Sequence, residues 1–181
     1  MKYDEIIVMK NGEEAHLRNA VESDGAAVVQ NFNLTHEETD FLLTYPEENS
    51  MDAKQEGEFL QKKADSDNEI EIIALVDGKV AGTAGIAAIG TKYKLKHRAE
   101  FGISVAREYW GLGLGTALTN ACIKCAKEAG YEQLELDAVA DNKKAISLYE
   151  KAGFVEFGRN PKGFKSKFSG YQELVYMRLE L

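Results

Sequence analysis

Three glycines at alternate positions, Gly111, Gly113 and Gly115, separate a predicted strand (98–105) from a predicted helix (116–129). The helix is indicated by apolar residues that recur at helical spacing. Backbone N–H groups at the start of a helix are free to bind an anion, and the helix dipole favours negative charge there. Glycine also lets the main chain approach a phosphate closely. The segment therefore predicts a phosphate-binding turn.

The glycine spacing does not fit two familiar nucleotide-binding motifs. A P-loop would need Gly-Lys followed by Ser or Thr, which the turn lacks. The glycines form GxGxG rather than the GxGxxG of dinucleotide-binding domains, and the next predicted strand (133–139) does not end on a clear ribose-binding acid. From this motif alone, a turn that only packs against a sheet stays open as an alternative.

A second group of residues follows one predicted strand later. Asn142 stands at the entrance of a predicted helix (142–152). Ala145 and Tyr149 share one face of this helix because they are four residues apart. Gly153 then ends the helix, and Phe154 follows it. Taken alone, a tyrosine among small residues is usually a core residue whose hydroxyl has a partner.

Together the two motifs resemble those of the GCN5-related N-acetyltransferase (GNAT) family. The family pattern is a strand, Arg/Gln-x-x-Gly-x-Gly/Ala, a helix, a strand and Asn-x-x-Ala-x-x-x-Tyr-x-x-x-Gly-Phe, and the second motif is complete here. The resemblance covers residues 70–181 well and the N-terminal third more loosely. Trp110 departs from the pattern, since the family usually has Arg or Gln at this position. We expect pyrophosphate binding to survive, because backbone amides supply most of it.

The resemblance implies that acetyl-CoA is the acyl-donating cosubstrate. The histidines, His16, His36 and His97, show no metal-ligand spacing, so we predict no metal. The resemblance also implies that strand 98–105 splays from strand 133–139, so that main-chain groups of Ile103 and Val105 pair with the pantetheine arm. Asn142 should also reach the cofactor. The pyrophosphate should be held by the backbone amides of Leu112, Gly113, Leu114, Gly115, Thr116 and Ala117.

The implied reaction moves an acetyl group to an amine, which must first lose a proton because alkyl ammonium groups have a pKa near ~10.4. A carboxylate can accept that proton. Phosphinothricin-type members of the family carry a glutamate at the spacing of Glu100, and ribosomal-protein N-terminal acetyltransferases carry one where Asp137 stands. We favour Glu100 and keep Asp137 as the alternative. A backbone N–H near Ile103 would stabilise the oxyanion, and Tyr149 would protonate the leaving thiolate.

The remaining elements follow from turn and capping signals. In the N-terminal third we predict a hairpin over 3–20 with a type I′ turn at Asn11-Gly12, and a helix from Ser23 or Asp24 to about Phe32. Thr35 and Glu38 suggest a capping box for a second short helix that ends at Pro46, and 51–64 forms a third helix with Phe59 and Leu60 as apolar anchors.

Further along the chain, we predict strands 70–76 and 79–89 around an Asp77-Gly78 turn. The last two strands are 154–158 and 171–181, with a basic loop at 161–169 between them. Loops 45–51 and 161–169 should shape the acceptor pocket. This order predicts an α/β fold of the α+β type: one GNAT domain over 1–181, with a mixed, mostly antiparallel central sheet and helices on both faces.

Composition narrows the classes of function. The 181 residues carry a net charge of −8, which disfavours nucleic-acid and anionic-membrane partners. No run approaches the ~20 apolar residues of a membrane span, and the start is not a signal peptide. Two cysteines, Cys122 and Cys125, indicate a reducing compartment, and we expect a cytoplasmic protein.

Three functions follow from these predictions. The favoured acceptor is a small-molecule amine such as a polyamine, an amino acid or an antibiotic-like amine. Acetylation of a protein N-terminus or lysine is the second function, and a non-catalytic CoA-binding sensor is the third. A homodimer is left open as the assembly.

Overall fold

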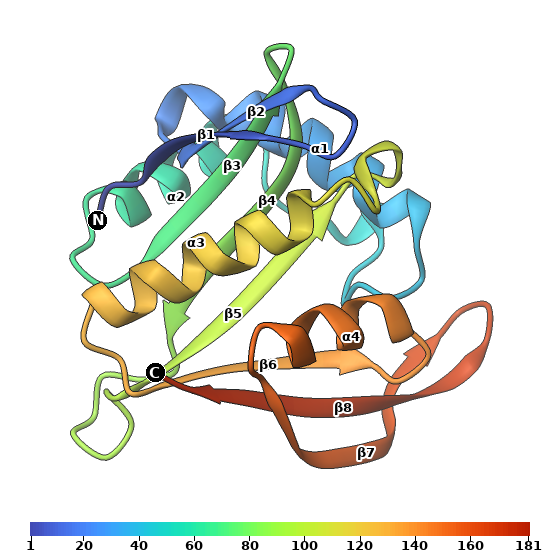
Figure 1. The fold of residues 1–181 in the computed structure, drawn as a ribbon. Helices are drawn as coiled ribbons and strands as arrows, with labels where there is room; N and C mark the ends of the chain where they lie inside the picture. The colour runs from blue at the N-terminus through green and yellow to red at the C-terminus, as the bar shows by residue number, and fades with distance from the viewer.

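The computed structural model describes all 181 residues, and its strands form one sheet in the order β1-β2-β3-β4-β5-β6-β8-β7 (Figure 1). Only β5 and β6 pair in parallel, so the predicted mixed, mostly antiparallel sheet is confirmed. The strands are β1 (Asp4–Val8), β2 (Glu14–Asn19), β3 (Ile70–Val76), β4 (Lys79–Ala88), β5 (Arg98–Val105), β6 (Gln133–Val139), β7 (Val155–Ser166) and β8 (Gly170–Glu180). The α-helices are α1 (Gly25–Glu38), α2 (Ala53–Ala64), α3 (Leu114–Glu128) and α4 (Lys143–Lys151).

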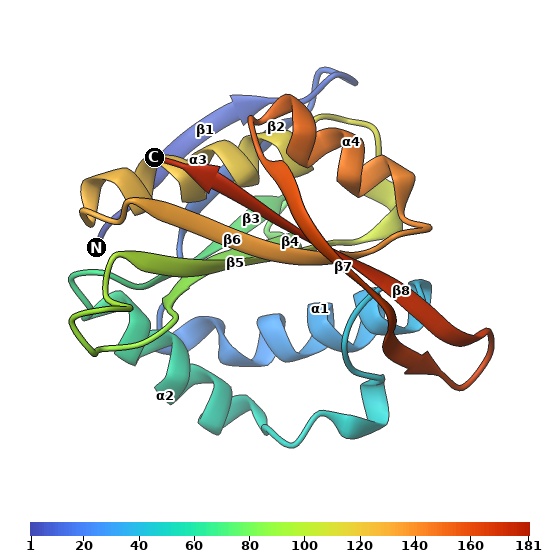
Figure 2. The ribbon, with the colours of Figure 1, turned by 90° about the horizontal axis from the view of Figure 1, so that it is seen from below.

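Helices cover both faces of the sheet, as predicted: α3 and α4 lie on one face and α1 and α2 on the other (Figure 2). Strand β5 shows how the sequence directs this layering. Ala99 and Phe101 are buried in the core under α3, whereas Glu100 and Gly102 point to the opposite face and stay exposed. The apolar stripe of α3 is buried against the same core, and both cysteines in it are free and buried. None of the helices is both long and apolar enough to cross a bilayer.

The two predicted hairpin turns differ in outcome. The predicted turn at Asp77-Gly78 is present, and both residues have positive φ (48° and 76°), which is type I′ geometry. In the first hairpin only Gly12 has positive φ, so the prediction of a type I′ turn is wrong. The Met9 carbonyl accepts the Gly12 N–H at 2.9 Å, and Lys10–Gly12 form a three-residue loop. Loops of this length commonly place a glycine in the left-handed region.

The N-terminal helices correct the predicted boundaries. Helix α1 continues through Phe32 to Glu38, so there is no second helix capped by Thr35. The Thr35 side chain is buried, and its hydroxyl donates to the Phe32 carbonyl at 3.1 Å. This bond satisfies the buried hydroxyl within the helix, so the side chain does not cap a helix start. Pro46 begins a 3₁₀ turn (Pro46–Glu48) rather than ending a helix.

Helix α2 begins later than predicted because Asp52 caps it. The Asp52 carboxylate accepts the N–H groups of Lys54 and Gln55 at 2.9 and 2.8 Å. Leu60 is fully buried, as expected of an anchor, but Phe59 remains 38% exposed.

The C-terminal hairpin is longer than predicted. Strand β7 extends through Pro161 to Ser166, so the expected basic loop over 161–169 is wrong, and only the three residues 167–169 connect β7 to β8. The pairing with β8 shifts between Asn160 and Phe164. This irregularity accommodates Pro161, which has no N–H for a regular ladder.

Candidate active site

Strands β5 and β6 diverge in the middle of the sheet, which confirms the predicted splay. Their parallel pairing joins only Arg98–Glu100 to Gln133–Glu135, although the strands continue to Val105 and Val139 (Figure 1). Beyond Glu100, therefore, the main chain of each strand has no partner on this side. We refer to this region as the β5–β6 opening.

The hydrogen-bond pattern shows which main-chain groups face the opening. The Ala106 N–H donates to Ala81 at 2.9 Å, and the Ile89 N–H donates to Arg98 at 3.2 Å. Since residues of an antiparallel strand bond alternately to either side, these two bonds assign the even-numbered residues of β5 to β4. The N–H and C=O groups of Ile103 and Val105 point into the opening. These are the two residues that the sequence singled out for the pantetheine arm.

The opposite wall of the opening comes from β6. The Ala140 N–H donates to Glu173 at 2.8 Å, so the even-numbered residues of β6 bond to β8. The main chain of Asp137 and Val139 consequently points toward β5. The Val139 carbonyl is used locally, because it accepts the Asn142 N–H at 2.9 Å.

The glycine-rich turn presents free amides at the start of α3. Gly111 and Gly113 have positive φ (80° and 96°), and α3 begins directly after Gly113. The first helical bond runs from the Ala117 N–H to the Gly113 carbonyl at 3.0 Å. The N–H groups of Leu114, Gly115 and Thr116 therefore have no partner within the helix.

This geometry fits a phosphate group. Only the Lys10 Cγ atom would lie within 4 Å of a Cβ on Gly113, at 3.9 Å, so the space beside the turn is open. Of the six predicted amides, Ala117 is engaged in the helix, and the Leu112 N–H makes a long bond of 3.4 Å to Tyr109. The amides from Gly113 to Thr116 are the ones available to an anion.

Trp110 makes a contact that the sequence did not predict. Its indole Nε1–H donates to the Val105 carbonyl at 2.6 Å. The Arg107 guanidinium lies over the indole ring, 5.5 Å from its centre. The Val105 carbonyl is thus occupied from within the chain, which leaves the Val105 N–H and both main-chain groups of Ile103 unpaired at the opening.

Helix α4 brings Tyr149 to the same region. The Asn142 side chain caps the helix by accepting the Ala145 N–H at 3.2 Å. The Tyr149 ring is 8% exposed and packs edge-on against Phe101 and Phe154, with ring centres 6.1 and 6.0 Å apart. Its hydroxyl makes no hydrogen bond within the protein. Burial and, second, the nearby Asp137 carboxylate raise the pKa of Tyr149 to about 12.

The two candidate bases occupy different places along the opening. Glu100 is opposite Glu135 at the last paired position, where the strands begin to separate. Asp137 lies two residues further along β6, beside the open stretch. Although Asp137 keeps contact with solvent, burial raises the pKa of its carboxyl group. The negative charge of Asp137 contributes to the raised pKa of Tyr149. The Asp137 side chain itself points to the face of the sheet opposite α4, because its neighbours Leu136 and Ala138 are buried in the core.

A pocket of about 310 Å³ lies on the face covered by α1 and α2. Ser104, which lies next to Val105, lines its floor, and the loop before α2 supplies part of its wall, as predicted for loop 45–51. Loop 161–169 contributes no lining residue. The lining residues are Val28, Phe32, Thr44, Glu48, Asn49, Ser50, Met51, Glu56, Phe59, Glu71, Thr83 and Ser104.

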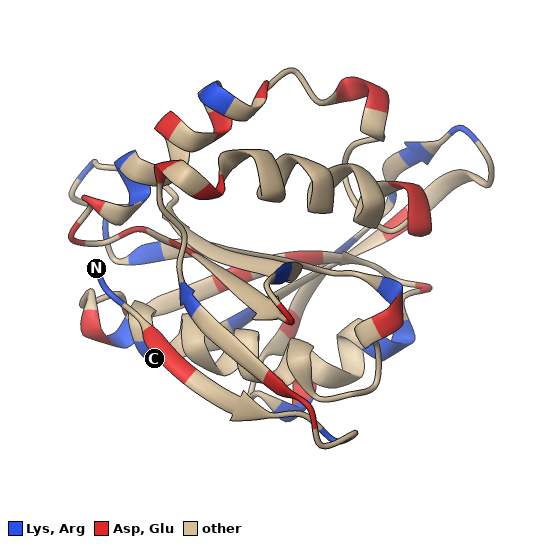
Figure 3. Cartoon of the chain, turned by 90° about the horizontal axis from the view of Figure 1, so that it is seen from above, with Lys and Arg blue, Asp and Glu red and all other residues tan.

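The pocket is acidic on one side. Its lining includes three acidic residues, Glu48, Glu56 and Glu71, and Figure 3 shows both acidic and basic residues on the covering helices. Lys63 pairs with Glu71 at 2.9 Å, which neutralises one of the three. Burial and, second, the neighbouring Glu71 raise the pKa of Glu56. The pocket can therefore accept a cation.

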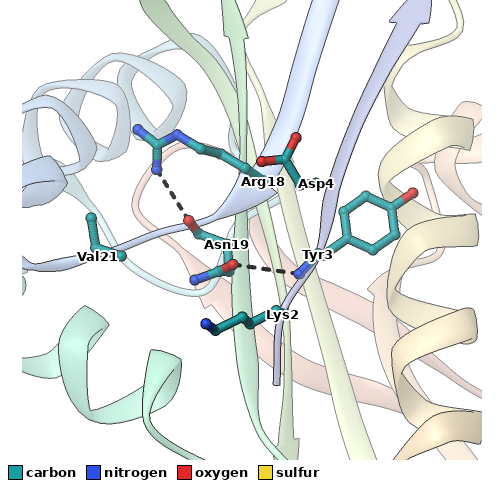
Figure 4. Close-up of a pocket in the computed structure, with 6 residues that line it drawn as sticks. All are labelled: Lys2, Tyr3, Asp4, Arg18, Asn19 and Val21. Atoms are coloured by element: carbon teal, nitrogen blue, oxygen red, sulfur yellow. Dashed lines mark hydrogen bonds between the residues drawn. The ribbon is translucent and has the colours of Figure 1, made fainter.

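A second pocket, of about 420 Å³, lies at the edge of the sheet (Figure 4). It is formed by residues of β1, β2 and the segments that flank them, among them Tyr3, Arg18 and Asn19. The Arg18 guanidinium is already paired with Asp24 at 2.7 Å. Strands β3 and β4 lie between this pocket and β5, so it takes no part in the site at the opening. The structure contains no cluster of three or more His, Cys, Asp or Glu residues able to hold a metal ion.

The chain matches the profile of a family described as "Acetyltransferase (GNAT) family" over residues 34–154. It is 35% identical over 94 residues to an N-alpha-acetyltransferase of Sulfurisphaera tokodaii, an alignment that covers 46% of this chain and 55% of that protein. The chain spans about half the length of the curated relatives it matches.

Solved structures resemble the chain over most of its length. A GNAT-family acetyltransferase from Streptococcus pneumoniae has a TM-score of 0.88 and 29% identity, with coverage of 92% of this chain and 99% of that one. The structure of yncA from Salmonella typhimurium with its cofactor acetyl-CoA has a TM-score of 0.81 and 20% identity, covers 92% of this chain and 94% of that one, and shows a shared fold. The profile match, which spans both sequence motifs and the β5–β6 opening, shows that this chain belongs to the GNAT acetyltransferase family.

Proposed function

We propose that the protein transfers the acetyl group of acetyl-CoA to a primary amine of a small molecule. One observation carries this proposal: three features meet at the β5–β6 opening. They are the unpaired main chain of Ile103 and Val105, the free amides at the start of α3, and the buried Tyr149 with an unbonded hydroxyl. An extended chain with amides at one end and phosphates at the other is complementary to the first two features.

The residues present would hold acetyl-CoA as follows. The pantetheine arm would pair with the Ile103 carbonyl and the Val105 N–H. The pyrophosphate would bind the amides from Gly113 to Thr116. Asn142 caps α4 with its oxygen, so only its NH₂ group can reach the cofactor.

The transfer would proceed by direct attack of the amine on the thioester. Asp137, directly or through water, would take a proton from the ammonium group, and the nitrogen would then form a bond to the acetyl carbon. The N–H of Ile103 would stabilise the oxyanion. As the carbon–sulfur bond breaks, the thiolate would receive the phenolic proton of Tyr149, and the second proton that the nitrogen loses in becoming an amide would restore the phenol. The raised pKa of Asp137 and its place beside the unpaired stretch of β6 favour it over Glu100, our preference from sequence, as the base.

The pocket supports a small acceptor that carries positive charge. Its volume of about 310 Å³ lies at the low end of the usual range of small-molecule sites, roughly 300–1,000 Å³. Phe32 and Phe59 provide apolar surface, and Glu56 provides a carboxylate. A second candidate acceptor is a protein N-terminus, which the name of the Sulfurisphaera tokodaii relative favours. We also propose a cytoplasmic location, supported by two free, buried cysteines.

The proposed function is tested by thiol release from acetyl-CoA with a panel of amines, including diamines, amino acids and peptides with free N-termini. Mass spectrometry then identifies the acetylated product, and EDTA tests the need for a metal. We expect turnover with a small amine that EDTA leaves unchanged. Turnover with peptides alone would establish the second candidate instead. Acetyl-CoA binding without transfer to any amine would point to a sensor.

A further inference from the structure

We propose that Lys10, in the first hairpin loop, binds the pyrophosphate of CoA and supplies the positive side chain that Trp110 does not. This inference rests on the proposed binding of CoA at the glycine-rich turn. It adds a residue from the N-terminal hairpin, 103 positions away from Gly113, to a site otherwise built from β5, α3, β6 and α4.

The hairpin loop docks directly on the glycine-rich turn. The Lys10 N–H donates to the Leu112 carbonyl at 3.0 Å, so the backbones of the two loops are joined. The Lys10 Cγ atom lies 3.9 Å from the position of a Cβ on Gly113. Figure 1 shows the β1–β2 loop next to the segment that connects β5 to α3. The side chain therefore starts beside the free amides, and its ammonium group can reach an anion bound there.

The charge of Lys10 has no partner in the protein. Lys10 is exposed and forms no salt bridge or side-chain hydrogen bond, whereas the neighbouring Glu13 carboxylate accepts the Asn11 side-chain N–H at 2.8 Å. The start of α3 carries the positive end of the helix dipole. The Lys10 ammonium group and this end of the helix repel each other. A phosphate bound between them would attract both.

The other cations around the turn are not equivalent. Trp110 occupies the position where the sequence pattern led us to expect Arg or Gln, and it donates to Val105 rather than facing the turn. Arg107 lies over the indole ring. Lys10 is thus the basic side chain that contacts the open side of Gly113. A lysine suits this place because its compact ammonium group can bind phosphate from several directions.

The inference is tested by isothermal titration of the full chain with CoA and with 3′-dephospho-CoA. The proteins are the wild type, Lys10→Ala, Lys10→Arg and Lys92→Ala, the last an exposed lysine in the loop before β5, at the other end of that strand. We expect Lys10→Ala to weaken binding of both ligands by about tenfold, the effect of a charge-assisted contact. Lys10→Arg should retain most of the affinity, and Lys92→Ala all of it. A thermal melt of each variant checks that folding is unchanged.

Other outcomes would overturn the inference. Unchanged affinity in Lys10→Ala would remove Lys10 from the site. A loss seen with CoA but not with 3′-dephospho-CoA would place Lys10 at the 3′-phosphate instead of the pyrophosphate. An equal loss of CoA affinity in Lys92→Ala would show that the effect comes from the net charge of the protein and not from a contact made by Lys10. Failure of the wild type to bind CoA would overturn the proposed function as well. If the wild type binds CoA and Lys10→Ala binds it equally well, only the inference about Lys10 fails.

Discussion

The ring of Tyr149 on α4 packs edge-on against Phe101 on β5, with ring centres 6.1 Å apart, near the opening where β5 and β6 diverge. Burial of the tyrosine is the larger cause of its raised pKa, and the negative charge of Asp137 adds to it. With a pKa of about 12, the phenol stays protonated at neutral pH and can donate its proton. A proton donor is therefore available near the place where we expect the thioester.

Tyr149→Phe is expected to lower kcat by at least ~10-fold while it leaves the affinity for acetyl-CoA unchanged. General acid catalysis contributes ~10²–10⁴-fold at most, and a thiolate is a good leaving group. The phenylalanine ring would keep its packing against Phe101 and Phe154. Steady-state kinetics and titration with acetyl-CoA measure the two quantities. The control is Tyr131→Phe, which changes another buried tyrosine, one bonded to Asn68 outside the opening. An equal kcat in both variants would make Tyr149 a packing residue only.

Asp137→Asn is expected to remove the acidic limb of the pH–rate profile. The base works only when it is deprotonated, so the wild-type rate should rise with pH through the raised pKa of Asp137. The asparagine variant should be slower by ~10²-fold and show no such limb. Glu100→Gln, measured with the same acceptor, should keep it. The reverse result would assign the base to Glu100, and a limb retained in both variants would assign proton removal to water.

Gly113→Asp is expected to abolish acetyl-CoA binding, whereas Gly130→Asp should not. Both glycines have positive φ (96° and 79°) and lie at opposite ends of α3, so either substitution strains the backbone similarly. Only the first places a carboxylate among the free amides. Titration with acetyl-CoA and a thermal melt of both variants separate binding from folding. Binding by Gly113→Asp at wild-type affinity would show that phosphate binds elsewhere.

The sequence predicted those parts of the site that are encoded locally. Strands β3, β5 and β6 have the predicted bounds because their apolar residues and flanking turns are contiguous. The glycine turn and the capped helix at Asn142 were recognised for the same reason. Thr35 and Glu38 misled because a capping-box spacing also occurs inside a continuous helix, and α1 continues through it.

Contacts between distant segments could not be predicted. The bond from Lys10 to Leu112 depends on how the first hairpin packs, and nothing in its local sequence indicates a partner 102 residues away. The same holds for the acidic pocket, which draws residues from α1, α2 and three strands. Segment 161–169 was predicted to be a loop because it is basic and contains glycine, but pairing with β8 continues past Pro161 through a change of register.

Trp110 should report acetyl-CoA binding by its fluorescence. It is the only tryptophan in the chain, and its indole N–H donates to Val105, a residue at the opening. A ligand that pairs with neighbouring main-chain groups should change the emission wavelength or intensity, with a midpoint that matches calorimetry. Truncated ligands that lack the pantetheine arm, such as 3′,5′-ADP, should produce a smaller change. No change on saturation with acetyl-CoA would place the arm away from Val105.

Asp137→Asn is also expected to raise the melting temperature at neutral pH, which would show that the base is held at a cost to stability. Burial raises the pKa of Asp137 above that of an unfolded aspartate, ~3.9, so the folded state binds this proton more tightly than the unfolded chain does. As the pH rises through the unfolded and then the folded pKa, the wild type loses stability from this group, and the loss is complete above the folded pKa. Asparagine does not ionise, so the difference in melting temperature between variant and wild type should be smallest near pH 3 and should reach at most a few degrees at pH 7. Melts across this range measure it, with Asp141→Asn as the control because this aspartate lies between β6 and α4, outside the strand that lines the opening. A variant less stable than the wild type at pH 7 would mean that the ionised carboxylate makes favourable contacts in the fold. Asp137 would then not destabilise the folded protein.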